Sequence, residues 1–185
     1  DSRLLVDRLD RDPRNAPLMK RDHFHVVQVL PAGPQIVGLE PKQLIFYDHS
    51  EFNLYAMESE FREHGLNCFP VLGSVDDLQR MKVVCKVFGV QTIYHAAAYK
   101  HVPLIEQNPW QGMLNNVLGT QCVLKQCVEN KTGQFVFVST DKAVRPTNVM
   151  GATKRFAELV LQGLSQRQTN TMFSMVRFGN VLESS

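Results

Sequence analysis

The stretch QFVFVSTDKAVRPTNVMGATKR, residues 134–155, contains one complete passage from a strand to a helix. It opens with a short apolar run, which predicts a buried strand over Gln134–Ser139. Further on the apolar spacing becomes helical and predicts a helix over Val149–Gln166. Asp141 and Lys142 stand side by side where the chain leaves the strand, so an acid and a base are expected together at the edge of a sheet.

The same alternation runs along the chain after residue 22. Strands are expected at Phe24–Leu30, Gln43–Asp48, Asn67–Leu72, Gln91–His95, Gln134–Ser139 and Met172–Phe178, and helices at Glu51–His64, Asp76–Phe88, Pro109–Glu129 and Val149–Gln166. Apolar strands that alternate with amphipathic helices predict an α/β protein with a Rossmann-like, doubly wound parallel sheet. Ligands of such sheets bind beyond the carboxyl ends of the strands.

The composition is that of a soluble globular domain. The 185 residues are 44% hydrophobic and 21% charged, with a net charge of +2 and no basic cluster, so nucleic-acid binding is not expected. The four cysteines and six histidines show no metal-ligand spacing, so no metal is expected and the thiols are expected to be reduced. No apolar run reaches the 18 residues that a membrane-spanning helix needs.

Polar residues follow the second and third predicted strands. The second ends in Asp48, before His49 and Ser50, and an acid there is placed to accept hydrogen bonds from an adenosine ribose. Capping of the next helix by Asp48 is an equal alternative. Asp76 follows the third strand, where it would meet an adenine edge, although N-capping by Ser74 or Asp76 is the plainer interpretation.

Small and amide side chains follow the fourth strand. Ala96, Ala97 and Ala98 would let a flat ligand lie against the backbone, or would simply allow tight packing. Asn116 interrupts the apolar face of the next helix and needs a hydrogen-bond partner there, either the backbone or an active-site network. In the last helix, Lys154 lies one turn after Met150, on the same face, where it is either solvated or functional.

Five segments together carry a resemblance to a known family: DHSEFNLY (48–55), HAAAYKHVPLIEQNPW (95–110), NNVLGT (115–120), STDKAVRPTNVMGATKR (139–155) and VRFGNVL (176–182). The chain resembles the CapD-like polysaccharide-biosynthesis group of UDP-N-acetylglucosamine 4,6-dehydratases, in the extended short-chain dehydrogenase/reductase superfamily. The resemblance covers roughly residues 40 to 182, and the block from Asp141 to Lys154 is its most specific part.

The resemblance implies a UDP-N-acetylhexosamine substrate, with UDP-GlcNAc the leading candidate, and bound NAD, with NADP as the alternative. The sugar would be oxidised at C4, lose water across C5–C6 and be reduced at C6. Lys142 would be the base at C5 and Asp141 the acid for the C6 hydroxyl, while Thr140 would bind the C4 oxygen and Lys154 the nicotinamide ribose. Met150 stands where the superfamily usually has a catalytic tyrosine, which marks a subgroup.

The remaining sites that the resemblance implies are contacts with the two ligands. The substrate would meet Lys100, Thr140, Arg177 and Asn180. The cofactor would meet Asp48, His49, Ser50, Asp76, Ala96, Ala97, Ala98, Asn116 and Lys154. Members of the subgroup are mostly long proteins with membrane-spanning segments, so an upstream anchor and a place at the cytoplasmic face of the inner membrane are further expectations. A homo-oligomer is a separate expectation.

The sequence departs from the family at two places. After the first strand, residues 31–38 keep only Gly33 and Gly38 of the expected glycine-rich loop, and residues 31–42 leave little room for a helix. The chain also ends three residues after RFGNVL, where the family continues into its substrate-binding part. We therefore expect an arm over residues 1–22 and a truncated NAD(P)-binding domain over 23–185. A nucleotide-sugar epimerase and a non-catalytic Rossmann remnant are the alternatives to a dehydratase.

Overall fold

The computed structural model describes residues 24–28, 41, 43–63, 65, 68–167 and 170–179, the first segment by its backbone alone. Its strands are β1 (Phe24–Gln28), β2 (Gln43–Asp48), β3 (Cys68–Leu72), β4 (Thr92–His95), β5 (Gln134–Thr140) and β6 (Met172–Phe178). Its helical elements are α3 (Glu51–Glu63), α4 (Leu78–Phe88), α5 (Val102–Gln107), α6 (Pro109–Met113), the π-helical segment η2 (Leu114–Gly119), α7 (Thr120–Glu129), the 3₁₀ turn η3 (Asp141–Ala143) and α8 (Val149–Ser165).

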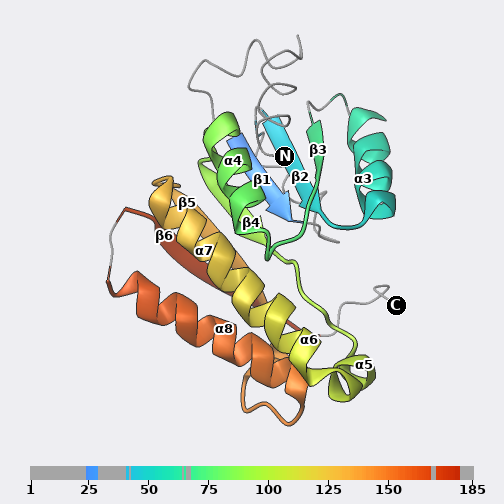
Figure 1. The fold of residues 1–185 in the computed structure, drawn as a ribbon, viewed down its shortest axis with the longest axis vertical. Coiled ribbons are helices and arrows are strands. Elements are labelled where there is room, and N and C mark those ends of the chain that lie inside the picture. The colour runs from blue at the N-terminus through green and yellow to red at the C-terminus, as the bar shows by residue number, and fades with distance from the viewer. Residues whose placement is uncertain are drawn as a thin grey trace.

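The six strands form one parallel sheet in the order β3-β2-β1-β4-β5-β6 (Figure 1). The order reverses between β1 and β4, which is the crevice where doubly wound sheets bind ligands. This confirms the predicted fold class. The expected altered loop at residues 31–38, the arm at 1–22 and the end of the chain lie outside the described residues.

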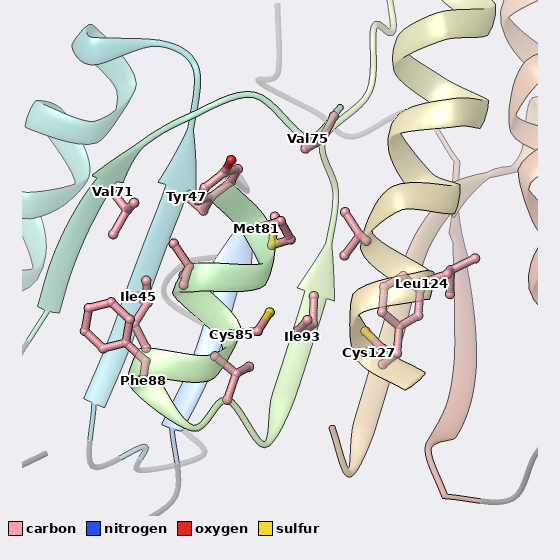
Figure 2. Packing of buried hydrophobic residues seen from close by; sticks show 14 of the residues in the cluster. Ile45, Tyr47, Val71, Val75, Met81, Cys85, Phe88, Ile93, Leu124 and Cys127 are labelled. Atoms are coloured by element: carbon pink, nitrogen blue, oxygen red, sulfur yellow. The ribbon is translucent and has the colours of Figure 1, made fainter. Parts of the chain in front are cut away.

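Alternate residues of β2 face two different hydrophobic layers. Ile45 and Tyr47 belong to a core shared with α4, α7 and α8, whereas Leu44 and Phe46 pack against α3 on the opposite face. In Figure 2 the side chains of α4 and α7, among them Met81, point toward the strands. Helices therefore cover both faces of the sheet, as the pattern of apolar strands predicts.

Local signals explain most of the boundaries. Asp77 caps α4 by accepting a hydrogen bond from the amide of Arg80, so the expected capping by Ser74 or Asp76 is wrong. At its other end Gly89 adopts φ +56° and ends the helix. The predicted long helix over Pro109–Glu129 is present as α6, η2 and α7 in succession. In the described part of the chain, no helix combines the length and the apolar character needed to cross a membrane.

Candidate functional site

A cavity of about 770 Å³ opens at the carboxyl ends of the strands. Asp48 and His49 line one part of it, and Ala96, Ala97, Ala98 and Lys100 line another. The structure thus gathers six of the predicted ligand-binding residues around one space, although they come from two distant strand ends. A volume of this size is in the range of cofactor and substrate sites. The other predicted site residues that the structure describes are not among its lining residues: Ser50, Asp76, Asn116, Thr140, Asp141, Lys142, Met150, Lys154 and Arg177.

The carboxylate of Asp48 is held by the turn that follows β2. Its Oδ1 accepts a hydrogen bond from the Ser50 amide at 2.6 Å, and His49 Nδ1 lies 3.4 Å from the same oxygen. Ser50 in turn caps α3, since its hydroxyl oxygen accepts from the amide of Asn53 at 3.3 Å. The capping role considered for Asp48 therefore belongs to Ser50, and Asp48 lines the cavity.

Asn116 lies in the π-helical segment η2 and is 1% exposed. Its Oδ1 accepts from the Tyr99 amide at 2.8 Å, and its Nδ2 donates to the Tyr99 carbonyl at 3.1 Å and to Thr153 Oγ1 at 3.0 Å. This side chain fastens the cavity wall after β4 to helix α8. The expected hydrogen bonding of a buried asparagine is confirmed, with backbone and side-chain partners together.

Thr140, Asp141 and Lys142 lie together where β5 passes into η3. Thr140 Oγ1 donates to Asp141 Oδ1 at 3.0 Å, and Lys142 Nζ lies 3.4 Å from the same oxygen. The hydrogen bond from Thr140, followed by the charge of Lys142, holds the pKa of Asp141 below its usual value. An Asp141 that acts as an acid must therefore first take up a proton from elsewhere.

The first turn of α8 is built onto this segment. Asn148 caps the helix by accepting from the Gly151 amide at 2.7 Å, and a Cβ at Gly151 would overlap the Lys142 carbonyl. Glu106 of α5 accepts a hydrogen bond from the Val149 amide at 2.6 Å. The strand exit, the start of α8 and the cavity wall are thereby joined.

Met150 and Lys154 are both buried, at 4% and 7% exposure, on the inner face of α8. Lys154 Nζ donates to the Val138 carbonyl at 2.8 Å and lies 4.5 Å from the centre of the Phe137 ring. Burial lowers the pKa of Lys154 to about 8, although the charge of Glu158 acts in the opposite direction. Lys154 is thus held by β5 and is not among the residues that line the cavity.

Arg177 is engaged by a buried carboxylate. Its Nε and Nη2 donate to Glu158 Oε1 and Oε2 at 2.8 and 2.7 Å. Glu158 was not among the residues that the sequence predicts for the site. It lies one turn after Lys154 on an apolar helix face, where a charged side chain, like the amide of Asn116, needs a hydrogen-bond partner.

Helix α5 was not predicted from the sequence either, although its Ile105 lines the cavity. The predicted substrate contact Asn180 lies outside the described residues.

Residues 33–185 match the family described as "Polysaccharide biosynthesis protein". The capsular polysaccharide biosynthesis protein CapD of Staphylococcus aureus is 42% identical over 153 residues, which are 81% of this chain and 26% of CapD. A UDP-N-acetylglucosamine 4,6-dehydratase (inverting) of Campylobacter jejuni is 35% identical over 147 residues, 78% of this chain and 43% of that protein. A UDP-glucose 4-epimerase of Rickettsia canadensis is 40% identical over 113 residues, which are 60% of this chain and 33% of the epimerase.

The fold has close structural counterparts. The X-ray structure of Pen from Bacillus thuringiensis superimposes with a TM-score of 0.78 at 30% identity, over 88% of this chain and 52% of that one. The chain thus spans about a quarter to a half of the length of these similar proteins.

Proposed function

The chain belongs to the polysaccharide biosynthesis protein family, and on that premise we propose that it is part of an enzyme that modifies nucleotide sugars. Within that class we propose a 4,6-dehydratase that acts on UDP-GlcNAc with NAD. The observation that carries this proposal is the adjacency of Thr140, Asp141 and Lys142 at the exit of β5, because elimination across C5–C6 needs both a base and an acid. Epimerisation at C4 needs no base at C5.

The cavity residues fit a dinucleotide. Asp48 offers a carboxylate at the end of β2, suited to ribose hydroxyls, and Ala96–Ala98 offer a wall without bulky side chains. A bound nicotinamide cofactor supplies the reversible acceptance of hydride that oxidation at C4 and reduction at C6 require. Lys154 could bind the nicotinamide ribose only after its ammonium group leaves the Val138 carbonyl, since Lys154 does not line the cavity in this conformation.

The hydrogen bond from Thr140 to Asp141 suits the first proton transfer. A lowered pKa keeps Asp141 ionised, so the carboxylate has a vacant place for the proton, and it makes the protonated form a stronger acid for the later step. Thr140, bound to the C4 hydroxyl, would pass its proton to Asp141 as C4 is oxidised. This route needs no acid–base group at Met150, whose thioether cannot exchange protons.

The second proton transfer completes the elimination. Asp141, protonated in the first step, gives its proton to the C6 hydroxyl, which leaves as water. Lys142 in its neutral form takes the C5 proton and returns a proton to C5 when C6 is reduced. The C4 hydroxyl proton thus leaves within the water, so the groups balance over one turnover.

The test is to incubate the full-length protein that contains these residues with UDP-GlcNAc and NAD, and to identify the product by mass and NMR. We expect a UDP-sugar lighter by one water molecule, with a keto group at C4. A product of unchanged mass with inverted C4 would establish the epimerase instead. Absence of both products, together with absence of NAD binding, would support the non-catalytic remnant, for which the loop at residues 31–38 is the main argument.

A further inference from the structure

The side chain of Glu158 is fully buried in the middle of α8 and accepts four hydrogen bonds. Its Oε1 accepts from Ser139 Oγ at 2.7 Å and from Arg177 Nε at 2.8 Å. Its Oε2 accepts from Arg177 Nη2 at 2.7 Å and from Arg155 Nη1 at 2.8 Å. Each carboxylate oxygen therefore accepts from two donors, and these hydrogen bonds offset the cost of removing the charge from water.

The donors come from three elements, β5, β6 and α8 itself. Ser139 and Arg177 are register neighbours on the parallel strands β5 and β6, and both reach the same carboxylate of α8. Ser139 immediately precedes Thr140 and the acid–base pair. Glu158 thus connects the strand exit that presents the proposed catalytic groups to the helix that carries Lys154.

The chain that leaves β6 lies close to Asp141. Gly179 follows Arg177 by two residues, and a methyl group placed on Gly179 would lie 3.8 Å from Asp141 Oδ2. The chain leaving β6 therefore passes directly beside the proposed acid. A shift of Arg177 along its strand would move this backbone relative to the carboxylate.

We propose that Glu158 is a positioning residue for the dehydration and that Arg177 works with it, holding the ends of β5 and β6 against α8 rather than binding the nucleotide sugar. The catalytic part of this inference rests on the proposed function. An apolar contact of similar volume would give comparable net stability, so the distinctive contribution of the pair is geometric, although loss of one partner alone also destabilises the fold. Arginine is suited to this role because its planar fork binds both carboxylate oxygens at once.

The kinetic test compares Glu158→Gln, Arg177→Lys, Ser139→Ala and the double variant Glu158→Gln/Arg177→Lys in the full-length protein with UDP-GlcNAc. Each of the first two is expected to lower kcat by about 10- to 100-fold, because small displacements of reacting groups have effects of that size. KM and the dissociation constant of UDP should stay within about threefold of the wild type. The double variant should be no slower than the worse single variant, since the two residues act as one unit.

Leu161→Ala is the matched control. Leu161 is 3% exposed, lies on α8 three residues after Glu158 and packs in the hydrophobic core, so its truncation lowers stability without touching the carboxylate. At a temperature where this variant is folded, its kcat should stay within about threefold of the wild type. An equal loss of kcat in Leu161→Ala would show that general destabilisation explains the effect and would overturn the proposal. So would a rise of about tenfold in KM in Arg177→Lys alone, because Arg177 would then be a substrate contact.

Hydrogen exchange tests the positioning without any substrate. Glu158→Gln and the milder Ser139→Ala should speed exchange of the amides at the ends of β5 and β6, while exchange in β2, at Ile45 for example, stays unchanged. Unchanged exchange at both strand ends in both variants would contradict the inference. If the wild type converts no nucleotide sugar, the proposed function fails, and this measurement still decides whether Glu158 holds the strand ends.

Discussion

Gly151 and Lys142 are in direct backbone contact, because the first turn of α8 lies on the carbonyl of Lys142 so closely that a Cβ at position 151 would overlap it. The contact sets where α8 begins relative to the acid–base pair. The exit of β5, the 3₁₀ turn η3 and the start of α8 are therefore packed together in space.

Gly151→Ala is therefore expected to destabilise the protein by about 1–3 kcal/mol, since a methyl group must push the helix away from Lys142. Gly163→Ala is the control on the same helix, because nothing lies within 4 Å of its Cβ position. That change should stabilise α8 by about 0.5–1 kcal/mol through helix propensity. Chemical unfolding of both variants measures the two effects. Equal stability of the two variants would show that α8 does not need its close approach to Lys142.

Thr140→Val should raise the pKa of Asp141 toward its ordinary value. The hydroxyl of Thr140 is the first of the groups that lower this pKa, and valine keeps the shape without the donor. An NMR titration of the Asp141 carboxyl carbon in the ligand-free protein, with Lys142→Met as a comparison, measures the shift. Activity should also fall, because Thr140 is the proposed carrier of the C4 proton. An unchanged pKa would mean that the 3.0 Å hydrogen bond does not form in solution.

Lys154→Met should stabilise the folded protein at neutral pH by about 1–2 kcal/mol while removing activity. The pKa of Lys154 is lowered to about 8 by burial, so below pH 8 the folded state holds an ammonium group at a cost. As pH rises from 8 toward 10.5 the folded state carries neutral lysine, and the advantage of methionine should shrink. Unfolding curves at pH 7 and pH 10 measure the difference in unfolding free energy between Lys154→Met and the wild type, and so test its sign. Greater stability of the wild type at pH 7 would refute it.

Glu158 should contribute to stability in a pH-dependent way. Burial raises the pKa of its carboxyl, but the hydrogen bonds from Arg177, Ser139 and Arg155 outweigh burial and bring it from 4.5 to about 2. A lowered pKa stabilises the folded state above pH 4.5, by about 3 kcal/mol, and this contribution is lost as pH falls from 4.5 to 2. The difference in unfolding free energy between wild type and Glu158→Gln should therefore narrow between pH 6 and pH 3. A constant difference would contradict the lowered pKa.

The sequence was sufficient for the sheet and the long helices. In β2 every residue from Gln43 to Tyr47 is buried, and four of them, Leu44 to Tyr47, form a continuous apolar run that composition identifies as a buried strand. Helix α5 was missed because six residues are too few for a helical period to emerge, and Pro103 near its start obscured it further. The sequence also could not distinguish the π-helical segment η2 from the α-helices on either side, since it continues their apolar spacing.

The site was predictable in type but not in geometry. The helical period placed Met150 and Lys154 on one face, and both are indeed buried. The period could not show that the ammonium group of Lys154 turns toward Val138, because that depends on how α8 crosses β5. The partnership of Glu158 with Arg177 likewise joins residues 19 positions apart through the pairing of β5 with β6.

The most direct test of the account is the exchange of the C5 proton of UDP-GlcNAc in deuterated water, measured by NMR with the full-length protein and NAD. The wild type should form a 4-keto-6-deoxy product that carries deuterium at C5, because Lys142 exchanges its proton with solvent before returning it. Lys142→Ala should bind UDP with about the wild-type affinity and lose both the exchange and the product. Undiminished exchange at C5 in Lys142→Ala would contradict the assignment of Lys142 as the base.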